Sequence, residues 1–227
     1  MLAFDQTMTC MSSPSAGAMA KGIKMVESRL TGIRHAFFAI VALFTGAGAV
    51  ADTALAGSRL SLPVVRVVER YPPYADFCRR HPSECDLSGS PVLLHGTDLM
   101  DTIRVTNVTV NLEIKFMLDI SQYNAEEYWA LPTSGYGDCE DLALEKRSRL
   151  VKAGAAPSAL RLAFVFHRRY LNSHCVLTVE TSEGTYILDS YTDDVSLWDQ
   201  VPYNFEARER TDGLWDRFDQ IYWNYPR

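Results

Sequence analysis

Three residues of the kinds that perform nucleophilic catalysis follow one another along the chain: Cys139, His174 and Asp189. Cys139 comes after the glycine-rich loop 135–137 and opens a stretch that we expect to be helical, which places its sulfur at the positive end of a helix dipole. That position lowers the pKa of a thiol and supplies backbone N–H groups that can stabilise an oxyanion. With His174 as general base and Asp189 as orienting acid, the chemistry would be acyl transfer through a thiolate.

A helix and a hairpin are needed to bring these residues together. The spacing of apolar residues predicts a helix over 138–153 that ends at Gly154. Three runs with strand composition follow, at 161–166, 175–180 and 185–188, and the turn 181–184 joins the last two as a hairpin. Because one strand of a hairpin begins beside the point where the other ends, we expect His174 and Asp189 to be neighbours.

Each of the three residues alone has an ordinary structural interpretation. A single cysteine is commonly a small buried hydrophobe, a histidine a surface or capping residue, and an aspartate at a strand end a turn former. His167 is a rival base, but it lies at the far end of the preceding strand. The joint placement on a helix start and a hairpin favours the catalytic interpretation with His174.

Other parts of the chain are less decisive. Residues 97–118 fit either a helix capped by Thr97 or, over 108–118, an alternating strand. Residues 203–208 have strand composition. The stretch 58–96 contains five prolines, so we expect an extended, turn-rich arm with at most short helical turns that wraps the core.

The composition is that of one ordinary globular domain with appendages. The 227 residues are 47% hydrophobic, 22% charged and 11% aromatic, which excludes a disordered chain, a collagen and a polytopic membrane protein. The net charge of −6 argues against a nucleic-acid partner. We expect a targeting segment at 1–51, a proline-rich arm at 52–96 and a catalytic domain at 97–227.

The first segment has the features of a secretory signal. Four basic residues precede an uncharged run at 36–51, and Ala-x-Ala patterns stand at 49–51 and 54–56. A membrane anchor is the alternative, but the run is shorter than a span and rich in glycine and alanine. We therefore expect cleavage, a periplasmic or secreted protein, and no membrane span in the mature chain.

Cysteine usage agrees with export. Loss of the first segment removes Cys10 and leaves an even number of cysteines, which in an exported protein indicates disulfides. The close pair Cys78 and Cys85 is the expected bridge. A metal site of Cys78, His81 and Cys85 is the alternative, but it lacks a fourth ligand nearby.

Two longer runs resemble a known protein family. They are YWALPTSGYGDCEDLALEKRSRLVKAG at 128–154 and LRLAFVFHRRYLNSHCVLTVETSEGTYILDS at 160–190. Both are similar to the bacterial transglutaminase-like cysteine proteinases, whose pattern is a W-x-x-P loop, G-D-C-E-D at the nucleophile, H-x-V-L-T at the base and L-D-N at the acid. The opening FCRRHPSEC looks like that of the alphaproteobacterial members. The resemblance covers roughly residues 77–215.

This resemblance implies an α+β fold with a papain-like, transglutaminase-like core, in which the nucleophile helix packs on an antiparallel sheet. It implies a triad of Cys139, His174 and Asp189, and it favours the helix over 97–114. The chain departs from the pattern at Cys175, where the family usually has Ala or Met, and at Ser190, where Asn is common. The 108–118 stretch is also more β-branched than such a helix usually is. None of these departures removes a triad member.

The carboxylates of Asp138, Glu140 and Asp141 surround the expected nucleophile. They oppose formation of a thiolate, because like charges raise the pKa of a thiol. A Ca²⁺ ion bound by Asp138 and Glu140 with backbone oxygens would offset them. One branch of the resembled family, periplasmic proteases that clip surface adhesins, depends on calcium through the matching acidic pair.

Two further interpretations concern this neighbourhood. The carboxylates could instead favour the helix N-terminus or pair with an arginine, the candidates being Arg147, Arg161 and Arg168. Trp129 and Tyr136 are expected to wall the cleft, although both could equally be core residues. No organic cofactor is expected.

The sequence therefore predicts an exported cysteine peptidase that acts on a periplasmic or cell-surface protein or peptide. Acyl transfer to an amine is an alternative, because the transglutaminase core performs both reactions depending on which nucleophile reaches the acyl-enzyme. A non-catalytic binding module on the same fold is the alternative of another class, and replacement of a triad residue would have favoured it.

Overall fold

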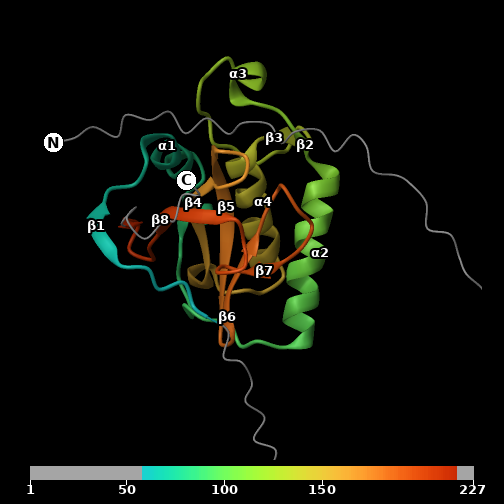
Figure 1. Cartoon of the computed structure of the whole chain (residues 1–227). Coiled ribbons are helices and arrows are strands. Elements are labelled where there is room, and N and C mark those ends of the chain that lie inside the picture. The colour runs from blue at the N-terminus through green and yellow to red at the C-terminus, as the bar shows by residue number, and fades with distance from the viewer. Residues whose placement is uncertain (1–57, 219–227) are drawn as a thin grey trace, which may run out of the picture. The chain divides into compact units, whose positions relative to one another are not determined.

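The computed structural model describes residues 58–218, which build an antiparallel sheet with helices along one face (Figure 1). The sheet has seven strands in the order β1-β9-β8-β4-β5-β6-β7, and every pair is antiparallel. Its strands are β1 (Val64–Val68), β4 (Leu160–His167), β5 (Asn172–Thr181), β6 (Gly184–Leu188), β7 (Ser196–Leu197), β8 (Tyr203–Glu209) and β9 (Trp215–Phe218). A separate parallel pair joins β2 (Lys115–Phe116) to β3 (Tyr136–Gly137).

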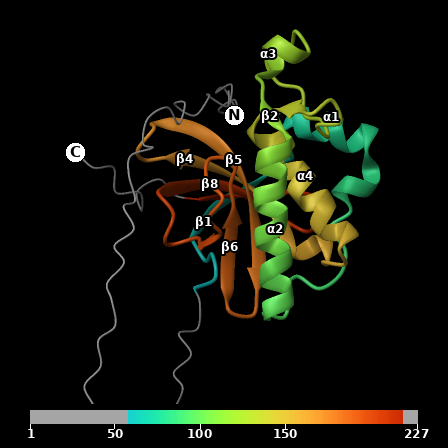
Figure 2. The ribbon, with the colours of Figure 1, turned by 90° about the vertical axis from the view of Figure 1, so that its right-hand side faces the viewer.

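The helices are α1 (Pro72–Arg80), α2 (Thr97–Glu113), α3 (Asp119–Gln122) and α4 (Cys139–Lys152), with short 3₁₀ turns η1 (Pro82–Cys85) and η2 (Pro157–Ala159). Figure 2 shows α1, α2 and α4 together on one side of the sheet. This arrangement is the expected α+β fold, with the helix that begins at Cys139 packed on an antiparallel sheet.

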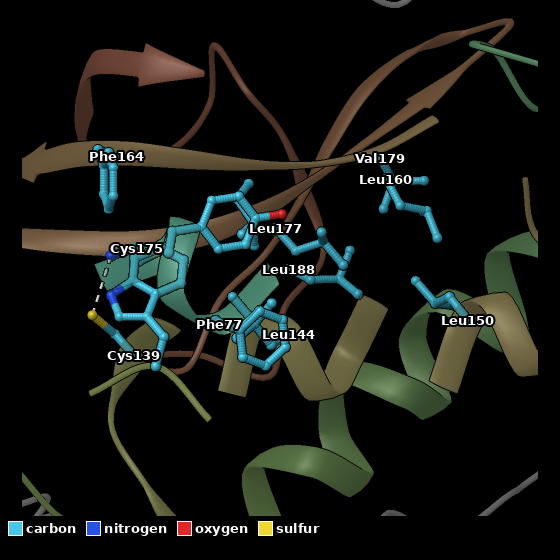
Figure 3. Packing of buried hydrophobic residues seen from close by; sticks show 14 of the residues in the cluster. Phe77, Cys139, Leu144, Leu150, Leu160, Phe164, Cys175, Leu177, Val179 and Leu188 are labelled. Carbon is cyan, nitrogen blue, oxygen red and sulfur yellow. Dashed lines mark hydrogen bonds between the residues drawn. The ribbon is translucent and has the colours of Figure 1, made fainter. Parts of the chain in front are cut away.

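The interior strand β5 is buried on both faces. Cys175, Leu177 and Val179 join the core between sheet and helices, whereas Val176 packs with Ala163 in a second cluster on the opposite face. This division follows from the two-residue repeat of a strand. Figure 3 shows Leu177, Val179 and Leu188 of the sheet above Leu144 and Leu150 of α4.

Helix α4 begins and ends close to where its sequence predicts. Asp138 is the N-cap residue, and Gly154 follows the helix with φ +97°, a left-handed conformation that favours glycine. Along its length α4 packs against β5 and α2. The hairpin of β5 and β6 is also confirmed, with Thr181 opposite Gly184 at its turn.

Helix α2 resolves the ambiguity of residues 97–118 in favour of a helix. Met100, Ile103 and Val110 form its buried stripe, so its β-branched composition yields to the tertiary packing of this face. The predicted cap is wrong by one residue: the N-cap is Gly96, and Thr97 is the first helical residue.

The proline-rich segment is more ordered than its composition predicts. Pro72 and Pro73 occupy the first turn of α1, where a missing N–H costs nothing, and so they start a helix instead of preventing one. Tyr74 and Phe77 of α1 lie in the same core as α4, and the expected disulfide joins Cys78 to Cys85. This segment therefore contributes to the core, in contrast to the wrapping arm we expected.

The expected signal lies outside the described residues. Within residues 58–218, no helix is long and apolar enough to cross a membrane.

Candidate active site

Cys139 is the first residue of α4 and is almost completely buried. The backbone N–H of Cys175, on β5, points at its sulfur from 3.3 Å, as the dashed line in Figure 3 shows. The loop before Cys139 needs a glycine, because a Cβ on Gly137 would come within 2.9 Å of Asp141 Oδ2.

His174 and Asp189 are neighbours, as the hairpin predicts. His174 Nε2 lies 2.7 Å from Asp189 Oδ1, with both side chains buried. Because Leu177 is paired with Leu188, Asp189 follows the end of β6 and reaches His174 across the open end of the hairpin. The ring of Tyr191 stacks on the His174 imidazole with centroids 4.0 Å apart.

Asp189 is held by donors on both carboxylate oxygens. The backbone N–H of Tyr191 donates to Oδ1, and the hydroxyl of Tyr203 donates to Oδ2. Burial alone would raise the pKa of Asp189, but the positive charge and hydrogen bond of His174 and the hydrogen bond of Tyr203 lower it to about 2. Asp189 is therefore a buried carboxylate that stays ionised.

Cys139 and His174 line one small cavity together with Trp129. Its other lining residues are Glu127, Glu140, Phe164, Ser173 and Cys175. Tyr136 does not line the cavity: it is on β3, partly exposed, with the ammonium of Lys115 over its ring. His167, the rival base, does not line the cavity. Its ring packs edge-on against Tyr203, and its Nδ1 accepts the backbone N–H groups of Arg169 and Tyr170.

Five carboxyl groups gather beside the start of α4, in two sets that share Asp119. One set is Asp119, Glu127 and Glu140, and the other is Asp119, Asp138 and Asp141; within each set one oxygen per residue lies within 4.8 Å of the others. Neighbouring backbone N–H groups occupy one oxygen of Asp119 and one of Asp141.

Each member of the second set keeps one carboxyl oxygen without a hydrogen-bond partner. Asp119 Oδ1, Asp138 Oδ1 and Asp141 Oδ2 are buried without a hydrogen bond. Converging, unpaired carboxylate oxygens are the donor set of a hard cation such as Ca²⁺. The residues present therefore fit a calcium ion.

Burial and mutual repulsion disfavour ionisation of these groups. Burial, and then the charge of Asp138, raise the pKa of Asp141 to about 9. Burial raises the pKa of Asp138 to about 7, with a contribution from Asp119, and burial and the charge of Asp138 raise the pKa of Glu127 to about 8. The pKa of Glu140 is raised in the same way. A bound cation would reverse this effect.

None of the three candidate arginines pairs with these carboxylates. Arg147 forms a buried ion pair with Glu209, at 2.8 Å, and Arg161 pairs with Glu180 at 3.0 Å. Arg168 donates to the backbone oxygen of Val201. The arginine interpretation of the acidic residues is therefore wrong.

A model of the bacterial transglutaminase-like cysteine proteinases (BTLCP) matches residues 66–221. The chain belongs to this family. Family membership makes it a cysteine peptidase of the BTLCP type, and the match includes Cys139, His174 and Asp189 within its bounds. No curated protein matches the chain.

Solved structures of LapG from Legionella pneumophila are similar to this BTLCP member. The calcium-bound form is 22% identical with a TM-score of 0.47, covering 53% of this chain and 72% of LapG. The EGTA-treated form is 21% identical with a TM-score of 0.47, covering 66% of this chain and 81% of LapG.

Two residues of the acidic sets escaped the sequence analysis. Asp119 and Glu127 come from α3 and the loop after it, well before the GDCED motif in the chain. Nothing in their local pattern marks them, because Asp119 begins the one-turn helix α3 and Glu127 lies in the loop after it, between the paired strands β2 and β3. Only the tertiary structure brings Asp119 to the start of α4.

Proposed function

We propose that this chain is an exported cysteine peptidase that hydrolyses a peptide bond through a thioester on Cys139. The observation that carries the proposal is the buried His174–Asp189 pair, 2.7 Å apart, beside a cavity that Cys139 also lines. The location of Cys139 at the N-terminus of α4 supports it, because the helix dipole stabilises a thiolate there.

In the proposed mechanism, Asp189 engages His174 Nε2 and leaves Nδ1 to accept the proton of the Cys139 thiol. The thiolate attacks the carbonyl carbon, and the charge that develops on oxygen is met by backbone N–H groups at the start of α4. The C–N bond breaks as His174 returns the proton to the amine. Water then attacks the thioester, gives a proton to His174 and releases the acid, and His174 reprotonates the sulfur.

We propose that a Ca²⁺ ion is held by Asp119, Asp138 and Asp141, with Glu140 beside them. The three unpaired buried oxygens support this proposal. A bound cation would neutralise carboxylates that otherwise oppose a thiolate one residue away. It would also fix the loop that carries Cys139.

The proposal is tested by labelling the reduced full chain with a thiol-reactive peptide probe and mapping the adduct by mass spectrometry. We expect selective labelling of Cys139 over Cys175, whose pKa is raised by burial. His174→Ala should abolish the selectivity. The control is His95→Ala, which removes a histidine that pairs with Glu183 and does not line the cavity, and it should label like the wild type.

The same experiment with a calcium chelator tests the cation. Loss of labelling on chelation and its return with Ca²⁺ are expected. If Cys139 reacts no faster than an unactivated cysteine with and without Ca²⁺, the peptidase proposal fails, and a binding function on this fold takes its place.

Products distinguish hydrolysis from transfer to an amine. Cleavage of a peptide substrate without incorporation of an added primary amine supports hydrolysis. Amine incorporation that exceeds cleavage would contradict it.

We propose export with removal of the first segment, near residue 51. The Cys78–Cys85 disulfide supports this proposal, because such bonds persist in oxidising compartments. N-terminal sequencing of the protein recovered from a bacterial periplasm tests it, and an intact residue 1 in that fraction would contradict cleavage.

A further inference from the structure

Helix α2 carries two asparagines, one turn apart, on the side that faces the rest of the molecule. Asn107 is completely buried and lies between Ile103 and Val110 in the apolar stripe. Asn111 follows four residues later and is partly buried. Asparagine is a poor residue for the interior of a helix and for an apolar stripe. Where a sequence breaks two local rules at once, a functional reason is expected.

Both asparagines bind the loop that follows β6, mainly through its backbone oxygens. Asn107 Nδ2 donates to the backbone oxygens of Thr192, at 3.0 Å, and Asp193, at 3.1 Å. Asn111 Nδ2 donates to the oxygen of Thr192, at 3.1 Å, and to Asp193 Oδ1, at 3.0 Å.

The same two side chains also hold Asp189 itself. The backbone N–H of Asp189 donates to Asn107 Oδ1 at 3.1 Å, and its backbone oxygen accepts from Asn111 Nδ2 at 3.0 Å. Both main-chain polar groups of Asp189 are thus bound by one helix. Its carboxylate is bound by His174, Tyr203 and the N–H of Tyr191.

This arrangement matters because Asp189 lies just beyond the last residue of β6. It has no strand partner to fix its backbone, and the loop after it has few regular contacts. A shift of about 1 Å in a group that orients a catalytic side chain can cost about a hundredfold in rate. The α2 asparagines replace the missing strand pairing.

We propose that Asn107 and Asn111 are positioning residues, which hold the main chain of Asp189 so that its carboxylate orients His174. The inference rests on the proposed function, because it requires His174 and Asp189 to activate Cys139. Neither asparagine lines the cavity. They act through Asp189.

A double-mutant cycle tests this. The four proteins are the wild type, Asn107→Leu, Asp189→Ala and the double variant, each as the reduced full chain with Ca²⁺. Leucine has the same branching and the same number of side-chain heavy atoms as asparagine and fits the apolar stripe, so it removes the hydrogen bonds without opening a cavity. The readouts are the maximal rate of Cys139 labelling and the probe concentration that gives half of it.

In the background that keeps Asp189, we expect Asn107→Leu to lower the maximal rate of Cys139 labelling roughly tenfold or more. The half-saturating probe concentration should stay unchanged. In the Asp189→Ala background the same substitution should change the rate less than about twofold, because the group it positions is gone. Thr106→Val is the control on the same helix: Thr106 is buried but makes none of these contacts with the loop, and its rate should stay at the wild-type value.

Asn111→Ala is measured in the same cycle as a second variant, because the site is only partly buried and alanine favours the helix. It decides the question if Asn107→Leu does not fold. Equal losses in both backgrounds for the folded variant would overturn the inference, since the asparagine would then not act through Asp189.

The two proposals fail in different ways. If Asp189→Ala lowers the rate but neither asparagine variant does, only the positioning inference falls. If Asp189→Ala leaves the rate unchanged, the proposed triad falls and the inference falls with it.

Discussion

Asp189 on one side of Cys139 and the pair Asp138 and Asp141 on the other are about equally buried, but their pKa values are shifted in opposite directions. Asp189 is 3% exposed and its pKa is lowered to about 2. Asp138 is also 3% exposed and Asp141 is 0% exposed, yet their pKa values are raised to about 7 and about 9. Burial therefore does not decide the protonation state of a carboxyl group here.

Their partners make the difference. Asp189 has His174 and two further donors, so the protein itself supplies what its charge requires. Asp138 and Asp141 have other carboxyl groups as neighbours, and each keeps a buried oxygen without a partner. The side of the site formed by Asp189 is complete within the protein, and we call it the complete side. The side formed by Asp138 and Asp141 keeps unpaired carboxyl oxygens, and we call it the incomplete side; in our proposal a cation completes it.

The largest effect should come from breaking the complete side. Asp189→Asn removes the negative charge that pairs with His174, and peptidase activity should fall roughly 10³- to 10⁴-fold, as for the orienting acid of other triads. Hydrolysis of a peptide substrate measures this. Asp194→Asn, an exposed residue of the same loop, is the control and should change activity less than about twofold. Retained activity in Asp189→Asn would contradict the role of Asp189.

On the incomplete side, we expect the stability of the protein to depend on bound calcium. Ca²⁺ should raise the melting temperature of the wild type, and Asp141→Asn should lower the affinity for Ca²⁺ by about tenfold or more, because it removes a ligand charge. Titration calorimetry and thermal unfolding measure both. Glu145→Gln, on the same helix but paired with Arg149, should leave the affinity unchanged. A Tm independent of Ca²⁺ would show that the acidic sets hold no such ion.

Lys146 lies near Asp189, and its protonation state tests whether the complete side needs a further positive charge. It is buried on α4, and burial lowers its pKa from 10.5 to about 7, although the charges of Asp189 and Asp193 oppose that shift. Between pH 7 and 10.5 the unfolded chain binds a proton that the folded chain does not, so the free energy of unfolding should rise with pH in this window.

Lys146→Met should remove that rise. The variant should be more stable than the wild type by an amount on the order of a few kcal/mol below pH 7, and the gain should vanish as the pH approaches 10.5. Urea unfolding at pH 6, 8 and 10 measures it. Lys152→Met, at the exposed end of the same helix, should show no such trend. A gain independent of pH would mean that Lys146 is charged in the folded protein.

The smallest effect is expected from trimming one donor on the complete side. Tyr203→Phe removes the hydroxyl that donates to Asp189 Oδ2 while the His174 contact stays. Activity should fall by about two- to tenfold, which corresponds to the roughly 0.5–1.5 kcal/mol of a typical hydrogen bond, because His174 and the N–H of Tyr191 still hold the carboxylate. Tyr186→Phe, on β6, is the control and should match the wild type. A loss as large as that of Asp189→Asn would mean that Tyr203 itself takes part in the chemistry.

Much of the complete side could be predicted from the sequence. A cysteine after a glycine loop marks the start of α4, and the turn at 181–184 fixes the hairpin, so His174 and Asp189 follow from local patterns. The incomplete side could be predicted only in part. Asp138 and Glu140 adjoin the nucleophile, but Asp119 reaches them through the fold of a distant, irregular segment.

The sequence by itself determined the helix of Cys139, the hairpin of His174 and Asp189, the Cys78–Cys85 bridge and the family, because each depends on short-range spacing. The spacing of residues 97–118 left helix and strand open and only the family resemblance favoured the helix, which the structure confirms. The tertiary structure alone decided that Asn107 reaches Asp189 and that the carboxyl groups of Asp119, Asp138 and Asp141 gather. These features depend on contacts between segments far apart in the chain, and no local pattern encodes such contacts.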